Sequence, residues 1–65
     1  MLLTIVKLPN REYLYIDGVI AANRDHFSSD NLVEYTFGDL DFELQTVHYN
    51  RELDEVPQYL EDLPE

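Results

Sequence analysis

The N-terminal part of the chain alternates short apolar runs with turn signals. Residues 2–8 are β-branched or apolar on both faces, which predicts a central, well-covered strand. Residues 12–16 and 19–23 form two further apolar runs joined by Asp17-Gly18, and an Asp-Gly pair between such runs is a strong hairpin signal. We therefore expect a three-stranded antiparallel meander.

A short helix is predicted over residues 29–37. Ser28 or Ser29 can cap its first turn, and Asp30 suits the positive end of the helix dipole. Gly38 is well placed to end it. The positions that share one helical side are Leu32, Val33, Thr36 and Phe37.

Residues 39–49 show the most regular alternation in the chain and predict a further strand. The positions expected to face the core are Leu40, Phe42 and Leu44, and those expected to face water are Asp39, Asp41, Glu43 and Gln45. Beyond Thr46 the pattern inverts, since Val47 and Tyr49 occupy the formerly polar face. Either a bulge or a second covered face near residue 46 would explain the inversion.

Residues 50–65 form an acidic C-terminal segment with enough apolar side chains to dock on the sheet. Pro57 suits the first position of a final helical turn. The segment could equally stay mobile and order on a partner. We expect one small α+β domain over residues 1–65: a mostly antiparallel sheet of about four strands in a β-β-β-α-β core over 2–49, followed by this segment.

The distribution of charge along the chain indicates which kinds of partner surface the protein attracts or repels. The 65 residues carry 14 acids and four bases, a formal net charge of −10. Residues 1–27 hold three acids and three bases, whereas residues 28–65 hold eleven acids and one base, so the whole excess lies in the second part. Such a field repels nucleic acid and lipid headgroups and attracts basic protein surfaces. The simpler interpretation is that the charge keeps a small domain soluble.

Several function classes lack support in the sequence. Gly18 and Gly38 are the only glycines, so there is no phosphate-binding loop, and no nucleophile motif is present. His26 and His48 match no metal-ligand spacing, and we expect His48 to be half-buried. We therefore expect no catalysis, metal or cofactor. The absence of cysteine, of a signal-peptide pattern and of a long apolar run favours a cytoplasmic protein.

The acids of the second part suggest a binding surface. Residues two apart on a strand lie about 6.8 Å from each other, so Asp39, Asp41 and Glu43 would form an evenly spaced row of carboxylates. That spacing is of the order of the spacing between neighbouring phosphates of a nucleic acid. The acids expected to extend the row are Glu34, Glu52, Asp54 and Glu55. A solvated strand face would also be polar, without any partner.

The tyrosines suggest a second surface. Tyr13 and Tyr15 share one face of the strand over 12–16, opposite Leu14 and Ile16. Tyrosine is favoured at protein interfaces because it offers rigid area with a polar tip. If the helix covers one sheet face, Tyr13 and Tyr15 lie on the other, which is either an exposed face that supports self-association or a second core layer.

In size, charge and lack of cysteine the chain is similar to the small inhibitors made by bacteriophages, including DNA-mimicking inhibitors of host enzymes. That similarity implies a protein that covers the basic nucleic-acid-binding surface of a host enzyme. One alternative is a structural or assembly module that forms a homodimer or docks in a larger particle. Another is an acidic antitoxin or adaptor whose C-terminal segment folds on a basic partner. No direct contact with nucleic acid or membrane is expected.

Overall fold

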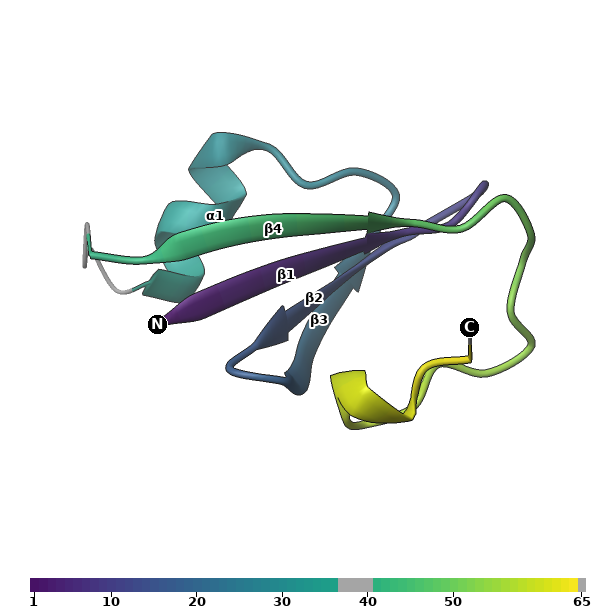
Figure 1. The fold of residues 1–65 in the computed structure, drawn as a ribbon. Helices are drawn as coiled ribbons and strands as arrows, with labels where there is room; N and C mark the ends of the chain where they lie inside the picture. The colour runs from purple at the N-terminus through teal and green to yellow at the C-terminus, as the bar shows by residue number, and fades with distance from the viewer. Residues whose placement is uncertain (37–40, 65) are drawn as a thin grey trace.

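The computed structural model describes residues 1–36 and 41–64, which form a four-stranded sheet with one α-helix (Figure 1). The elements are β1 (Leu2–Lys7), β2 (Glu12–Ile16), β3 (Val19–Arg24), α1 (Ser29–Thr36), β4 (Glu43–His48) and a short 3-10 helix, η1 (Leu60–Asp62). This architecture confirms the predicted small α+β fold and its β-β-β-α-β order.

The strand order across the sheet is β3-β2-β1-β4. β1 and β2 pair antiparallel, as do β2 and β3, so the predicted meander is present. β4 lies beside β1 and runs parallel to it. The sheet is therefore mixed, because the chain passes through α1 from one edge strand to the opposite edge.

The β2–β3 hairpin turns through Asp17 and Gly18. Both residues have positive φ, 50° and 87° respectively. Positive φ at both central positions defines the type I′ turn, whose twist matches that of the flanking strands. Asn and Asp tolerate this conformation better than other non-glycine residues, which explains the Asp-Gly pair.

One face of the sheet carries the main core under α1. Leu3, Ile5 and Leu14 from the sheet pack with Phe27 and Leu32 from the α1 region, and all five side chains are buried. The start of the helical region is tied down by a carboxylate: Glu12, which is only 8% exposed, accepts a hydrogen bond from the Phe27 N–H at 2.9 Å. The covered face therefore combines apolar packing with one buried carboxylate, that of Glu12, which accepts a hydrogen bond.

The N-terminus of α1 is capped by Ser28. Its hydroxyl accepts a hydrogen bond from the Asn31 N–H at 3.3 Å, while Asn31 Oδ1 accepts one from the Ser28 N–H at 3.0 Å. This reciprocal pair satisfies backbone donors that a helix start leaves open. The predicted helix is confirmed up to Thr36, and its expected end at Phe37 and Gly38 lies outside the described residues.

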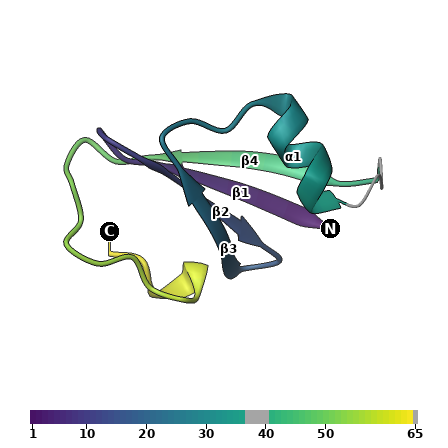
Figure 2. The same cartoon turned by 180° about the vertical axis from the view of Figure 1, so that it is seen from behind.

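The opposite face of the sheet is covered by the C-terminal segment (Figures 1 and 2). Tyr15, Val6 and Thr4 are 0% exposed, although they alternate with the residues of the main core. The Tyr15 hydroxyl donates a hydrogen bond to the Pro57 carbonyl at 2.6 Å. The segment is thus docked, and its last helical turn begins at Leu60, later than the predicted start at Pro57.

β4 differs most from the prediction. It begins at Glu43, after Asp41 and Phe42, and ends at His48. Phe42 packs against the core as expected, but the prediction that Leu44 is buried is wrong, because its side chain is 49% exposed at the sheet edge. His48 is exposed as well, contrary to expectation, because β4 has a neighbouring strand on only one side.

The inversion of the pattern after Thr46 has a simple cause. β4 pairs with β1 without a register shift, so no bulge is present between these strands. Val47 lies beside the buried Val6, on the face that the C-terminal segment covers. Of the two explanations offered by the sequence, the second covered face is the one observed.

Candidate functional site, an acidic hollow at one end of the sheet

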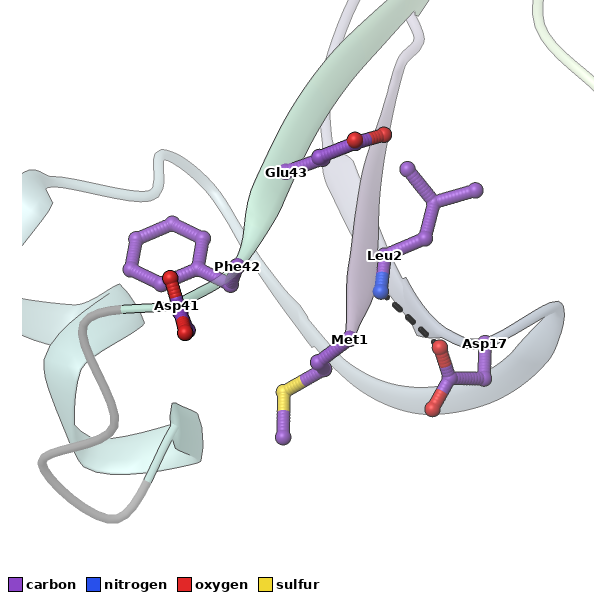
Figure 3. A pocket seen from close by; sticks show the side chains of 6 residues that line it. All are labelled: Met1, Leu2, Asp17, Asp41, Phe42 and Glu43. Carbon is purple, nitrogen blue, oxygen red and sulfur yellow. Dashed lines mark hydrogen bonds between the residues drawn. The ribbon is translucent and has the colours of Figure 1, made fainter.

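An open hollow of about 450 Å³ lies at the end of the sheet where β1 begins (Figure 3). It is lined by Met1, Leu2, Asp17, Asp41, Phe42 and Glu43. Three of these six side chains are carboxylates, and none is a lysine or an arginine. The hollow thus combines a concave shape with three carboxylate side chains.

Three separate parts of the chain meet here because of the strand directions. β2 runs antiparallel to β1, so Ile16 at its end pairs with Leu3 near the start of β1. β4 runs parallel to β1, so Glu43 at its start pairs with Leu2. The turn residue Asp17 and the strand residue Glu43 are therefore brought to the same end of the sheet.

Asp17 is held in place by two hydrogen bonds to one residue. Its Oδ1 accepts from the Leu2 N–H at 2.8 Å, and its own N–H donates to the Leu2 carbonyl at 2.8 Å. In Figure 3 the Asp17 carboxylate lies on one side of the hollow and that of Asp41 on the other, with Met1 between them. The hollow therefore has at least one carboxylate in a fixed orientation.

The rest of the hollow is apolar. Phe42 is partly buried against the core, Leu2 is half-buried, and Met1 is 42% exposed. Lysine and arginine side chains combine an apolar stem with a charged head, and they pack the stem on apolar surface while the head meets polar groups. A long cationic side chain is thus a group whose chemistry suits this hollow.

The predicted row of carboxylates is found only in part. Glu43 lies on β4, and Asp41 precedes the strand, so the two acids border the hollow and do not form a ladder along one strand. Asp39 lies outside the described residues. The regular spacing expected from an extended strand over 39–49 is therefore not what brings the acids together.

The acids expected to extend the row are distributed over the molecule. Glu34 is exposed on α1, and Asp54 and Glu55 are exposed in the C-terminal segment. Glu52 accepts a hydrogen bond from the Asn10 side chain in the β1–β2 turn, beyond the far end of β1. Glu43 and Glu52 therefore flank opposite ends of β4, a strand that spans roughly 20 Å.

Basic groups gather at that opposite end. The register places Arg24, Glu12, Lys7 and His48 in one row across β3, β2, β1 and β4. Lys7 Nζ lies 3.8 Å from the Glu12 carboxylate, and Arg11 Nη2 lies 3.9 Å from Asp25. The bases Lys7, Arg11 and Arg24 thus lie at the end of the sheet opposite the acidic hollow, where carboxylates accompany them.

The two tyrosines have unequal positions. Tyr13 is half-buried and borders a smaller hollow of about 140 Å³ together with Glu52 and Leu53. Tyr15 is completely buried, and burial raises its pKa to about 12, with the neighbouring phenols of Tyr13 and Tyr49 adding to the shift. The exposed-face alternative is wrong for Tyr15, because the C-terminal segment covers that face and makes it the second core layer.

Asp17 and Phe42 were not recognised as site residues from the sequence. The Asp-Gly pair explains Asp17 fully as a turn residue, and the alternation of residues 39–49 explains Phe42 as a core residue. The sequence nevertheless contained a signal for Asp17. In an antiparallel β1–β2 hairpin, the residue that follows β2 must lie beside the start of β1. The direction of β4, which brings Glu43 to the same end, had no sequence signal.

Comparison with protein-family models, with curated proteins and with solved structures finds no match for this chain. Within residues 1–36 and 41–64, no three histidine or carboxylate side chains are grouped so that they could hold a metal ion. Nor does this part of the chain contain a helix long and apolar enough to cross a membrane. The inference about function therefore depends on the geometry and charge of the described surface.

Proposed function

We propose that this protein binds another protein through its acidic end and covers a basic, nucleic-acid-binding surface of that partner. The observation that carries the proposal is the acidic hollow: Asp17 from the β2–β3 turn and Asp41 and Glu43 from the start of β4 border an open hollow without a lysine or arginine side chain in its lining. Catalysis forms no part of the proposal.

The hollow suits an arginine or lysine of the partner. Arginine pairs with carboxylates through two parallel hydrogen bonds, and its stem can pack on Met1 and Phe42. Each exposed charge pair contributes about 0.2–1 kcal/mol, so three carboxylates favour the bound state modestly by themselves. The apolar side chains of the lining add apolar contact area, which a surface made of carboxylates alone would not offer to the arginine stem.

The net charge of the chain indicates the class of protein that would bind it. Proteins that bind nucleic acid present lysines and arginines to the phosphates, and their basic surfaces are complementary to a protein with a net charge of −10. Complementary fields speed association and favour basic partners over acidic ones. A mimic of DNA charge that inhibits a host nucleic-acid enzyme, as phage inhibitors do, is the specific form of the proposal.

The test uses two column-bound variants with equal net charge. Asp41→Asn/Glu43→Gln removes two carboxylates from the hollow, whereas Asp54→Asn/Glu55→Gln removes two exposed carboxylates elsewhere. Each column receives a nuclease-treated bacterial lysate and is eluted first with duplex DNA and then with salt. We expect DNA to displace a discrete protein from the wild-type and Asp54/Glu55 columns, with much less retained on the Asp41/Glu43 column.

The captured protein then allows a quantitative comparison. The Asp41/Glu43 substitutions should weaken its binding by about twofold to thirtyfold, if each lost pair is worth 0.2–1 kcal/mol. They should also reduce the dependence of the association rate on salt. Equal losses in both double variants would show that net charge alone is responsible, and retention that DNA cannot displace would contradict the proposal.

The alternative of an assembly module requires a surface other than the one expected. The buried Tyr15 is bonded to the C-terminal segment of its own chain and is not available to a second subunit. A homodimer would therefore need another unpaired part of the sheet.

A further inference from the structure

The two edges of the sheet differ in their backbone hydrogen bonding. At the β3 edge the C-terminal segment adds backbone hydrogen bonds, from the Ile20 N–H to the Gln58 carbonyl and from the Leu60 N–H to the Gly18 carbonyl, both at 2.8 Å. Val19 and Tyr59 form an antiparallel bridge between these bonds. At the other edge, no described residue pairs with the outer side of β4.

The backbone groups on the outer side of β4 can be identified from its pairing with β1. The Glu43 N–H donates to the Met1 carbonyl and the Tyr49 N–H to the Lys7 carbonyl, both at 2.9 Å. Backbone groups alternate in direction along a strand, so the odd-numbered residues of β4 face β1. The N–H and C=O groups of Leu44, Thr46 and His48 consequently face outward.

Apart from Glu43 at its start, β4 also lacks the features that normally protect an edge strand. Its sequence, Glu-Leu-Gln-Thr-Val-His, contains no lysine and no proline, and its pairing with β1 shows no bulge. Lysine, proline and bulges are the devices that natural proteins use against edge-to-edge pairing. Leu44 adds an apolar side chain that is 49% exposed at this edge.

We propose that β4 pairs antiparallel with β4 of a second copy of the chain, so that the two four-stranded sheets become one continuous sheet. The charges of the strand and its flanks support this occupant. Asp41 and Glu43 lie at the start of β4, whereas Arg51 lies beyond its end, next to Glu52. An antiparallel arrangement brings each acidic start toward Arg51 of the partner subunit, and it closes as a two-fold dimer.

The register follows from the outward-facing groups. A two-fold axis at Thr46 places Thr46 opposite itself and Leu44 opposite His48 of the partner subunit. All three outward-facing residues of β4 then exchange backbone hydrogen bonds. An axis at Gln45 would pair fewer of them within the strand, because His48 would then lie opposite Phe42 of the partner subunit, which precedes β4. With the axis at Thr46, Asp41 comes level with Arg51 of the partner subunit. This proposal rests on the open edge of β4 and not on the binding function proposed above, although Asp41 borders both surfaces.

The absence of cysteine from the chain makes a cross-linking test direct. Directly opposed residues of a hydrogen-bonded antiparallel pair have Cα atoms about 5.5 Å apart, which a disulfide can bridge. Thr46→Cys should therefore form a disulfide-linked dimer under mild oxidation at least about tenfold faster than Gln45→Cys, whose thiol would not face its own copy. Similar rates in the two variants, or a faster reaction of Gln45→Cys, would overturn the proposed register and pairing.

The mass in solution provides the second measurement. Sedimentation equilibrium of the wild type should give twice the chain mass of 7.7 kDa, with dissociation on dilution. Thr46→Pro removes an outward N–H that the sheet itself does not use, and should yield a folded monomer, while Thr46→Val should remain dimeric. If Thr46→Pro does not fold, Thr46→Lys serves the same purpose. A wild type that stays monomeric at millimolar concentration overturns the proposal.

Discussion

Tyr15 shows how one residue serves both the fold and the docking of a distant segment. Its ring is fully buried in the face opposite α1, and its hydroxyl reaches the Pro57 carbonyl, 42 positions further along the chain. A buried hydroxyl must be hydrogen-bonded to avoid a desolvation cost. The C-terminal segment supplies that partner, so Tyr15 couples the sheet to the segment that covers it.

Replacing Tyr15 with phenylalanine keeps the ring and removes this bond. We expect Tyr15→Phe to lower the free energy of unfolding by about 1 kcal/mol, the usual net value of such a hydrogen bond. Urea denaturation near neutral pH measures the change. Tyr59→Phe is the matched control, since Tyr59 is 47% exposed, and it should change the free energy of unfolding little. Equal effects would contradict the assigned role of Tyr15.

The raised pKa of Tyr15 predicts a specific loss of stability in alkali. Its pKa is about 12 in the folded chain, above the ordinary value of about 10 for an unfolded tyrosine. The folded state therefore holds the proton more tightly, and this contribution to stability is fully present below about pH 10 and is lost as the pH rises through about 12. The ultraviolet absorbance of tyrosinate, followed with urea midpoints, should show this loss in the wild type and a smaller one in Tyr15→Phe.

At the scale of elements, the C-terminal segment behaves as a cover and as an edge strand. It binds the buried face through Tyr15 and the β3 edge through the Ile20 and Leu60 amides. Tyr49, just after β4, also donates through its hydroxyl to the Pro64 carbonyl at 2.7 Å. The segment should therefore unfold together with the sheet.

Amide hydrogen exchange tests this cooperation directly. The Ile20 and Leu60 amides should exchange as slowly as those of β1, because both are bonded across the interface between sheet and segment. The amide of Asp54, in an exposed stretch before the docked part, is the internal comparison and should exchange fast. Fast exchange at Leu60 and Ile20 alike would show that the segment is mobile in solution.

At the scale of the whole molecule, charge opposes compactness. Net charge far from zero destabilises a folded chain through self-repulsion, and here the formal value is −10 on 65 residues. Only a few attractive pairs, such as Lys7 with Glu12, offset it in the described structure. Repulsion between exposed charges is screened by salt, whereas the buried contacts are not.

Salt should consequently stabilise this protein. Raising the ionic strength from about 0.01 M to about 0.5 M should increase Tm by about 5 °C, which corresponds to roughly 1 kcal/mol for a domain of this size. Calorimetry at neutral pH measures the shift. Asp54→Lys/Glu55→Lys, which reverses two exposed charges, should show a smaller gain. A fall in Tm with salt would mean that attractive pairs dominate.

Local patterns were sufficient to predict most of the elements. The apolar runs, the Asp17-Gly18 turn and the cap at Ser28 depend on contacts between near neighbours, so the meander and helix followed from the sequence. The separation of a neutral first part from an acidic second part was likewise visible. These features require no knowledge of which distant segments meet.

Tertiary structure decided the rest, because a strand pattern does not encode which neighbour the strand pairs with or in which direction. Parallel pairing of β4 with β1 brings Glu43 to the end that holds Asp17, and it leaves Leu44 exposed at an edge. Docking of the C-terminal segment buries Tyr15, a residue that alternation alone assigns to either a surface or a second core. The amount and sign of charge were thus determined by the sequence, whereas the acidic hollow and the open edge arise only from long-range pairing.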